Sequence, residues 1–295
     1  MPRDLRAEGL LMICVVLWGS NYALSKYGIG AIDPMVFNAI RYVVAAIALH
    51  GYFLTGIRWI PLTREGWRNL VRAGLVANVL YQVAFITGLA LTSAANSAII
   101  LATAPLWTLL LYFRLHQQVI PGTTIAGILL SLAGIVLIVL GSGKQLEFGS
   151  LALLGDAICL LAALLWALNT NLQKPLVGRY PPPQVTLVMV TVGSIGLSIL
   201  AVPSLIQASW GNVHWTHFSA AIASGVLSIA LGNVLWSMGV KRLGPDGTAN
   251  FGNLVPLVAL TISYFVLHER LDRLQLVGSA VTLAGIWVVR AFSHR

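Results

Sequence analysis

Two tryptophans inside long apolar segments, Trp18 and Trp166, are the side chains of this sequence that most strongly suggest a binding function. Each is followed by polar groups at the spacing that keeps side chains on one face of a helix. These groups are Asn21, Tyr22 and Ser25 after Trp18, and Asn169, Thr170 and Gln173 after Trp166. Indole rings pack on flat apolar groups, and neutral amides hydrogen-bond polar groups of either charge. The two stripes therefore predict contacts with an organic solute.

Four other apolar segments carry stripes of the same kind. They are Asn78, Tyr81, Gln82 and Phe85; Gly232, Asn233, Trp236 and Ser237; Asn96, Thr103 and Trp107; and Asn250, Asn253 and Thr261. In a lipid environment such groups are costly unless they face protein or water, so the stripes should point inward. A single Asn or Thr could serve only to hold helices together, but the joint pattern favours a cavity. The predicted substrate-binding residues are Trp18, Asn21, Tyr22, Asn78, Tyr81, Gln82, Trp107, Trp166, Asn169, Asn233 and Trp236.

Catalytic chemistry has little support in the sequence. The acidic residues that flank apolar segments all lie near segment ends: Glu8, Asp156, Glu269 and Asp272. The histidines are at segment ends or in connections, so no metal site is expected, and no Ser or Cys stands beside a plausible base. Walker and dinucleotide motifs are absent from the sequence, and we expect no cofactor. Cys14 and Cys159 lie inside apolar segments, which argues against a disulfide.

Arg41 is the one charged residue well inside an apolar segment. A charge at such a position is a functional candidate, here for binding a carboxylate. The alternative is structural, because a long arginine side chain can reach the interface or cap backbone carbonyl groups.

Pro105 and Pro256 are expected to kink the helices that contain them, because proline removes a backbone hydrogen bond. A gating hinge and a tolerated structural bend are both open as interpretations.

The elements that carry these residues are apolar segments of the length that crosses a bilayer, which is about 20 residues. The 295 residues are 58% apolar and 9% charged, with a mean hydropathy of +0.85, whereas soluble domains have about 25% charged residues. Turn-forming pairs such as Asp33-Pro34 and Gly244-Pro245 separate ten predicted transmembrane helices. These are Leu5–Lys26, Pro34–Leu54, Asn69–Ala90, Ser93–Phe113, Gly122–Leu140, Ser150–Gln173, Pro183–Ile206, His217–Val240, Gly247–Leu267 and Leu271–Phe292. The sequence therefore predicts an all-α integral membrane protein, with the first segment a permanent helix and no soluble domain.

Lys and Arg residues divide unequally between the two sides of these ten spans. One side has Arg3, Arg6, Arg58, Arg64, Arg68, Arg72, Arg114, Lys174, Arg179, Lys241, Arg242, Arg290 and Arg295, and the other has Lys26, Lys144, Arg270 and Arg273. Cytoplasmic loops carry the excess of Lys and Arg, so both termini are predicted to be cytoplasmic. The same rule explains the net charge of +9, since the basic residues are not gathered on one nucleic-acid-binding face.

The two halves of the chain resemble each other. Glu8, Trp18, Asn21 and Lys26 recur at one constant spacing as Asp156, Trp166, Asn169 and Lys174, and Gly74, Gly88 and Pro105 correspond to Gly225, Gly239 and Pro256. The second and seventh spans match poorly. Because each half has five spans, the second half must be inverted relative to the first. Residues 1–145 and 146–295 are thus predicted to be two inverted repeats of one membrane domain, with a binding site near the midplane.

Several motifs resemble a known family: Leu17-Trp18-Gly19-Ser20-Asn21-Tyr22, Arg41-Tyr42, Ala104-Pro105-Leu106, Gly155-Asp156 with Trp166-Ala167-Leu168, and Val255-Pro256-Leu257 followed by His268-Glu269-Arg270-Leu271. The whole chain resembles the EamA-type branch of the drug/metabolite transporter superfamily, and looks most similar to the YddG-type exporters of aromatic amino acids. The resemblance implies an inner-membrane exporter with ten helices. Gln117-Gln118 departs from it, because the first half lacks an acidic residue like Glu269.

These observations predict a carrier that exports aromatic and other apolar amino acids by alternating access about a midplane cavity. It is expected to act as a monomer in the inner (plasma) membrane, with a small-molecule substrate and the lipid bilayer as partners and no nucleic acid. The alternatives are an exporter of another metabolite or drug, an intramembrane enzyme acting on a lipid, and a passive channel. Obligatory proton coupling is not expected, because no carboxylate lies in the middle of a span.

Overall fold

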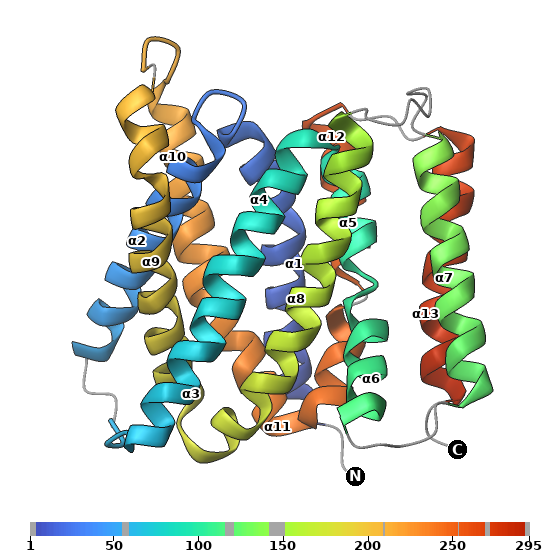
Figure 1. Cartoon of the computed structure of the whole chain (residues 1–295), viewed down its shortest axis with the longest axis horizontal. Helices are drawn as coiled ribbons and strands as arrows, with labels where there is room; N and C mark the ends of the chain where they lie inside the picture. The colour runs from blue at the N-terminus through green and yellow to red at the C-terminus, as the bar shows by residue number, and fades with distance from the viewer. Residues whose placement is uncertain are drawn as a thin grey trace.

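Helices make up all regular structure in the computed structural model, which describes residues 4–54, 59–115, 121–141, 151–208, 210–252, 254–268 and 272–292. In chain order they are α1 (Leu5–Gly28), α2 (Pro34–Leu54), α3 (Arg64–Gly74), η1 (Leu75–Leu80), α4 (Tyr81–Leu91), α5 (Ala94–Leu101), α6 (Ala104–Leu115), α7 (Gly122–Gly141), α8 (Leu151–Arg179), α9 (Pro182–Gln207), α10 (Trp215–Ala223), η2 (Ser224–Gly232), α11 (Asn233–Gly252), α12 (Val255–Val266) and α13 (Arg273–Phe292). They run up and down between two edges of the molecule (Figure 1). The all-α prediction is confirmed.

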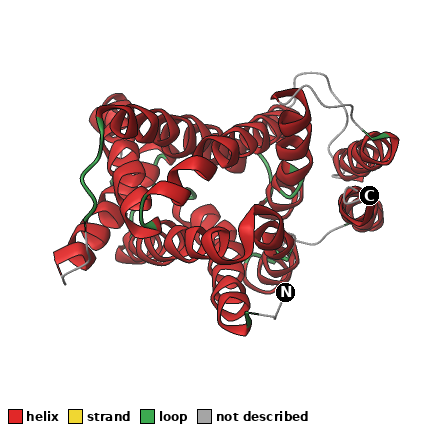
Figure 2. Cartoon of the chain, turned by 90° about the horizontal axis from the view of Figure 1, so that it is seen from below, coloured by secondary structure: helices red, strands yellow, loops and turns green. Residues whose placement is uncertain are grey.

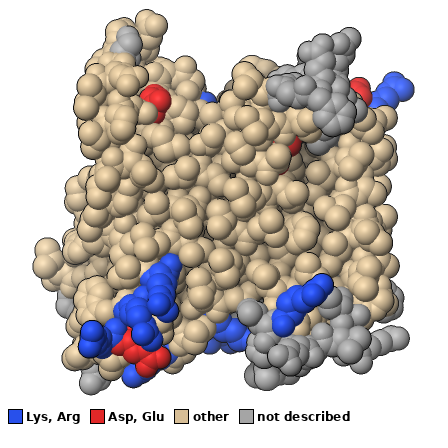
Figure 3. Space-filling view, viewed as in Figure 1, with Lys and Arg blue, Asp and Glu red and all other residues tan. Residues whose placement is uncertain are grey.

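Six helical stretches are long and apolar enough to cross a membrane: Leu5–Gly28, Pro34–Leu54, Arg64–Leu91, Leu151–Arg179, Pro182–Gln207 and Trp215–Leu243. Charged side chains lie toward the upper and lower edges of the face shown in Figure 3, and a wide uncharged band separates them. Large apolar side chains such as Ile47, Ile199 and Trp287 are exposed at the surface of the protein. Soluble monomers rarely expose apolar surface on this scale. The chain is a multi-pass membrane protein, and the total of ten spans stays a prediction.

One predicted span is broken in two. The helix expected at Ser93–Phe113 is interrupted by a turn at residues 102–103, between α5 and α6. Pro105 lies in the first turn of α6, and Pro256 likewise lies in the first turn of α12. Proline is well tolerated there, because the N–H that it lacks has no partner within the helix. Each of these spans is therefore broken just before its proline, which lies in the first turn of the following helix, and is not one continuous kinked helix.

The single helix predicted at Gly247–Leu267 is divided between two helices in the structure. In the structure α11 continues to Gly252, and α12 begins only at Val255. The predicted turn at Gly244-Pro245 is helical. Helix α11 thus continues through Pro245, although a proline inside a helix removes one backbone hydrogen bond.

The stretches Arg64–Leu91 and Trp215–Leu243 each contain a π-helical segment, η1 and η2 respectively. Such segments are rare and often mark functional places in long helices. Both begin beside a closely packed glycine: a Cβ added to Gly74 would lie 3.2 Å from the Met189 carbonyl oxygen in α9, and one added to Gly225 would collide with the Arg41 carbonyl oxygen in α2. The two π-helical segments therefore pack against α9 and α2 in the same manner.

Helices α7 and α13 pack on each other and stand to one side of the other helices (Figures 1 and 2). Glycines permit this close approach. A Cβ added to Gly134 would lie 2.6 Å from the Gly278 carbonyl oxygen, and a Cβ at Gly278 would lie 2.6 Å from the Gly134 carbonyl oxygen. Small residues at a helix contact let two backbones approach within a membrane, where no hydrophobic effect drives them together.

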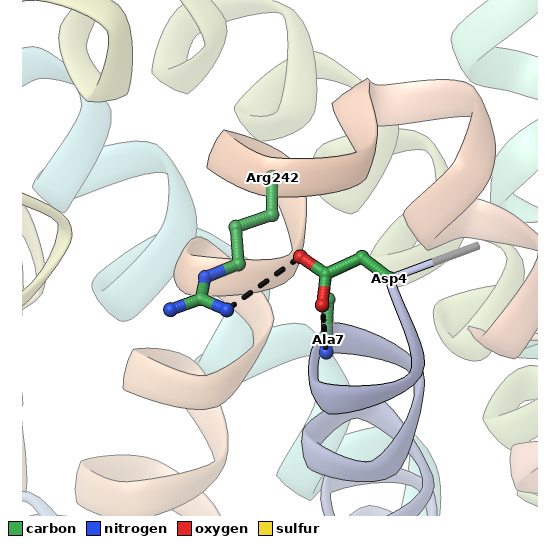
Figure 4. A network of polar contacts seen from close by, with 3 residues as sticks. All are labelled: Asp4, Ala7 and Arg242. Atoms are coloured by element: carbon green, nitrogen blue, oxygen red, sulfur yellow. Dashed lines mark hydrogen bonds and ion pairs between the residues drawn. The ribbon is translucent and has the colours of Figure 1, made fainter. Parts of the chain in front are cut away.

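Polar contacts connect α1 to its neighbours at both edges of the bundle. Near its start, Asp4 accepts a hydrogen bond from the Ala7 N–H at 3.1 Å and lies 3.5 Å from Arg242 of α11 (Figure 4). This ion pair is exposed and contributes at most about 1 kcal/mol. Near the end of α1, the Lys26 ammonium donates to the Leu89 carbonyl oxygen at 2.6 Å, close to the last residue of α4. A cation is favoured there by the helix dipole.

Candidate functional site

Six aromatic side chains from four helices form one continuous group, the ring cluster. Its members are Trp18 and Tyr22 of α1, Tyr81 and Phe85 of α4, Trp166 of α8, and Trp236 of α11. Ring centroids are 5.5 Å apart for Trp18 and Trp166, 4.9 Å for Trp18 and Trp236, 5.1 Å for Tyr81 and Trp166, 6.0 Å for Tyr81 and Phe85, and 5.6 Å for Tyr22 and Phe85. These separations lie within the range of favourable aromatic pairs, about 4.5–7 Å.

The two paired tryptophans of the ring cluster lie about halfway along α1 and α8. Trp18 follows the first residue of α1 by about 20 Å and Trp166 follows the first residue of α8 by about 22 Å, at 1.5 Å per residue. Tyr22 and Phe85 are buried, whereas Trp18, Trp166, Trp236 and Tyr81 remain partly accessible. Rings that remain partly accessible keep part of their surface free for contact with another molecule. The cluster can therefore offer flat apolar walls to a solute.

The position of Trp18 is set by the π-helical segment η2. Its indole Nε1–H donates to the Ser228 carbonyl oxygen at 3.1 Å, and the Ser228 hydroxyl donates to the Leu17 carbonyl oxygen at 3.0 Å. One turn further, the Asn21 side-chain oxygen accepts a hydrogen bond from the Ser224 hydroxyl at 2.5 Å. Helix α1 is thus joined to η2 by buried polar contacts along the face that carries the predicted site residues.

A second polar network lies beside Phe85, between α2 and the η1–α4 stretch. The Tyr42 hydroxyl donates to the Asn78 side-chain oxygen at 2.9 Å, and the Asn38 amide donates to the Gln82 carbonyl oxygen at 3.1 Å. Arg41 donates through Nη1 to the Asn38 side-chain oxygen at 3.4 Å. Asn78 and Gln82 therefore lie at the predicted inward face, in contact with α2.

The remaining predicted residues are not joined to the ring cluster by any described contact. Trp107 is partly accessible and donates to the Thr103 hydroxyl at 3.1 Å within its own predicted span. Asn169 is buried, and its side-chain oxygen has no hydrogen-bond partner in the described part of the chain. Asn233 is partly accessible. Their roles stay predictions, as do those of Gln117, Gln118, Asn253 and Glu269, which lie outside the described residues.

The sequence reasoning missed Asn38, Ser224 and Ser228 as partners of the site residues. Asn38 had a usable signal, because it stands three residues before Arg41 and four before Tyr42, on one helical face. Ser224 and Ser228 had no such signal in the sequence, because their partners lie more than two hundred residues away.

A cavity of about 320 Å³ lies elsewhere, between the α1–α2 turn and the α9–α10 connection. Asp33, Gln207 and Trp210 are among its lining residues. None of the ring-cluster residues lines it, so we do not assign it to the substrate.

The comparison with known families decides the class of the protein. The sequence profile of the EamA-like transporter family matches the chain twice, at residues 5–140 and 153–291. The chain belongs to the EamA-like transporter family. This confirms the resemblance inferred from the motifs, and it makes the protein a transporter rather than an enzyme acting on lipid.

Relatives and a solved structure agree with this EamA family assignment. A transporter of Archaeoglobus fulgidus, named only as uncharacterized, is 24% identical over 97% of this chain and 98% of its own length. A Salmonella typhimurium protein named "Probable amino-acid metabolite efflux pump" is 24% identical over 96% of this chain and 94% of its own. One crystal structure superposes with a TM-score of 0.71 at 18% identity, covering 99% of this chain and 98% of that chain. That similarity concerns the fold alone.

Proposed function

We propose that this EamA-family protein exports aromatic and other apolar amino acids by alternating access about a cavity lined by the ring cluster. The observation that carries the proposal is the cluster itself, in which rings from α1, α4, α8 and α11 meet and stay partly accessible. An aromatic side chain packed on one such ring gains about 0.5–1.5 kcal/mol beyond the burial of its area.

The polar surroundings of the ring cluster support an amino acid over a drug cation. The groups around it are mostly neutral amides and hydroxyls, such as Asn21, Asn78 and Gln82. These can hydrogen-bond both charged ends of a zwitterion. The printed name of the Salmonella typhimurium relative points to the same substrate class. Another metabolite or drug remains the second candidate, because one fold serves many solutes.

The transport mechanism rests on a proposed architecture of ten spans in two inverted repeats, residues 1–145 and 146–295. Two matches to one family profile support it. So do paired irregularities at similar places in the two halves: the π-helical segments η1 and η2, and the helix breaks at residues 102–103 and at Leu254. Inverted repeats allow one site to face either side of the membrane in turn.

We further propose that both termini are cytoplasmic and that the protein acts as a monomer in the inner (plasma) membrane. The described Lys and Arg side chains support this orientation. Those toward the lower edge, where α1 begins, are Arg6, Arg64, Arg68, Arg72, Arg114, Lys174, Arg179, Lys241 and Arg242, whereas Lys26 and Arg273 lie toward the upper edge (Figures 1 and 3). The more basic side of a membrane protein is the cytoplasmic one.

Purified protein in proteoliposomes loaded with labelled tryptophan tests the proposed function. We expect saturable release of chemically unchanged tryptophan, inhibited by excess phenylalanine. Trp166→Ala should raise the half-saturating tryptophan concentration, because it removes one wall of the ring cluster. The matched control is Trp287→Ala, since Trp287 of α13 is 66% exposed and is not a member of the ring cluster.

Three results would contradict the proposal. They are release that does not saturate, transport of sugars or cations in preference to aromatic amino acids, and equal effects of the two tryptophan substitutions.

A further inference from the structure

Arg41 lies deep in the protein and does not reach an interface. It is 1% exposed and stands about 10 Å along α2 from Pro34, at 1.5 Å per residue. The guanidinium lies 5.7 Å from the Phe37 ring centroid and 5.9 Å from that of Phe85, a member of the ring cluster. A side chain held among rings is not positioned to reach the lipid headgroups.

The hydrogen-bonding capacity of Arg41 is largely unused. A guanidinium has five N–H donors. The described chain offers it one hydrogen bond, the 3.4 Å contact from Nη1 to Asn38, and leaves the buried Nε–H without an acceptor. No Asp or Glu among the described residues forms an ion pair with it. A buried charge without a partner is costly, so it is expected to have one when the protein is working.

Packing does not require an arginine at this position. Met189 follows Arg41 at the same spacing that separates Trp166 from Trp18. Each residue presents its backbone to the glycine beside a π-helical segment, Met189 to Gly74 and Arg41 to Gly225. In the second half, the residue that makes the corresponding contact is a buried methionine, Met189, which is 3% exposed.

We propose that Arg41 binds the carboxylate of the transported solute while the ring cluster holds its apolar side chain. The Gln82 side-chain oxygen is buried and has no hydrogen-bond partner among the described residues, and the Gln82 backbone is connected to Arg41 through Asn38. The Gln82 side-chain oxygen is the acceptor for the ammonium group of the solute. Together the two unused groups select an α-amino acid with a flat side chain. The inference rests on the proposed function and names the groups that recognise the substrate.

The test compares tryptophan with tryptophan methyl ester, which lacks the carboxylate, in calorimetric binding to the full-length protein. Wild type should bind tryptophan about ten- to a hundredfold more tightly than the ester, the range for a charge-assisted hydrogen bond. In Arg41→Met this preference should fall to within about threefold, and Arg41→Lys should retain part of it, because an ammonium cannot make the bidentate contact. The control Arg242→Met removes an exposed arginine and should keep the preference.

A second readout separates a binding charge from a structural one. Without ligand, Arg41→Met should unfold at a temperature equal to or above that of wild type, because a buried unpaired charge is replaced by an apolar side chain. Gln82→Leu should weaken tryptophan binding and leave binding of indole-3-propionate, which lacks the ammonium, unchanged.

Several outcomes would overturn the assignment of Arg41. An Arg41→Met protein that keeps the wild-type preference, or that cannot fold, shows a structural role. If the wild-type protein transports tryptophan but binds tryptophan and its methyl ester equally tightly, the carboxylate contact is refuted and the proposed function stands. Wild type that neither binds nor transports any aromatic amino acid refutes both.

Discussion

The close fit between Gly232 and Trp18 allows the ring cluster to be perturbed by one methyl group. A Cβ added to Gly232 would lie 2.6 Å from Trp18 Nε1 and 3.0 Å from its Cδ1, whereas heavy atoms in contact need about 3.5 Å. Gly232→Ala must therefore move the indole by about 1 Å. That shift weakens the 3.1 Å hydrogen bond to the Ser228 carbonyl oxygen and disturbs the contact with Trp236.

The energetic cost follows from these contacts. Weakening the buried hydrogen bond costs about 1 kcal/mol, and overpacking costs about 1–3 kcal/mol. Alanine regains about 1 kcal/mol in a helix relative to glycine, so the net loss of stability is about 2 kcal/mol. Loss of one aromatic contact of about 0.5–1.5 kcal/mol with the substrate raises the half-saturating tryptophan concentration about two- to tenfold.

Thermal unfolding in detergent and tryptophan transport in proteoliposomes measure these two effects. Gly178→Ala is the matched control, because a Cβ at Gly178 in α8 meets no atom within 4 Å. It should leave transport unchanged and stability equal or slightly higher. If Gly232→Ala matches this control in both assays, Trp18 is not held as described, and the reasoning about the ring cluster fails.

Three further predictions concern topology, packing and energy coupling. In protein without its native cysteines, Gly211→Cys should react with an impermeant thiol reagent from outside the cell, and Arg64→Cys only after permeabilisation; the reverse pattern would contradict cytoplasmic termini. Gly134→Leu should separate α7 from α13 and lower stability by at least about 1–3 kcal/mol, measured by thermal unfolding, whereas Gly122→Leu should not, since a Cβ there meets nothing within 4 Å. With the membrane potential clamped, labelled tryptophan should leave proteoliposomes at the same initial rate with or without a pH gradient; accumulation driven by the gradient and abolished by Asp156→Asn would show proton coupling.

Local pattern was enough to predict much of the candidate site. Trp18 and Trp166 were paired because they recur at one spacing with similar neighbours, and the structure brings their rings to 5.5 Å. Tyr81 and Trp236 were selected because polar and aromatic residues follow one another at helical spacing, a signal within a single helix. Such signals need no knowledge of how helices pack.

Features that depend on contacts with neighbouring helices could not be predicted from the sequence. The break at residues 102–103 falls at Ala102 and Thr103, which carry no glycine or proline signal of their own. The π-helical segments leave no composition pattern either, and they occur where Gly74 and Gly225 meet other helices closely. The opposite error occurs at Gly244-Pro245, where a strong local turn signal predicts a break but the structure has continuous helix.

By itself the sequence determined that this protein lies in lipid, its helical class, its family and the aromatic character of its candidate site. Apolar length and helical spacing are properties of short segments, and lipid leaves helices as the way for such segments to satisfy their backbone hydrogen bonds. Only the tertiary structure decided which side chains meet. It placed Arg41 beside Phe85 and Trp18 against Ser228, although these contacts join residues far apart in the chain. The reason is that hydrogen-bond satisfaction in the interior is a property of several helices together, which no single segment encodes.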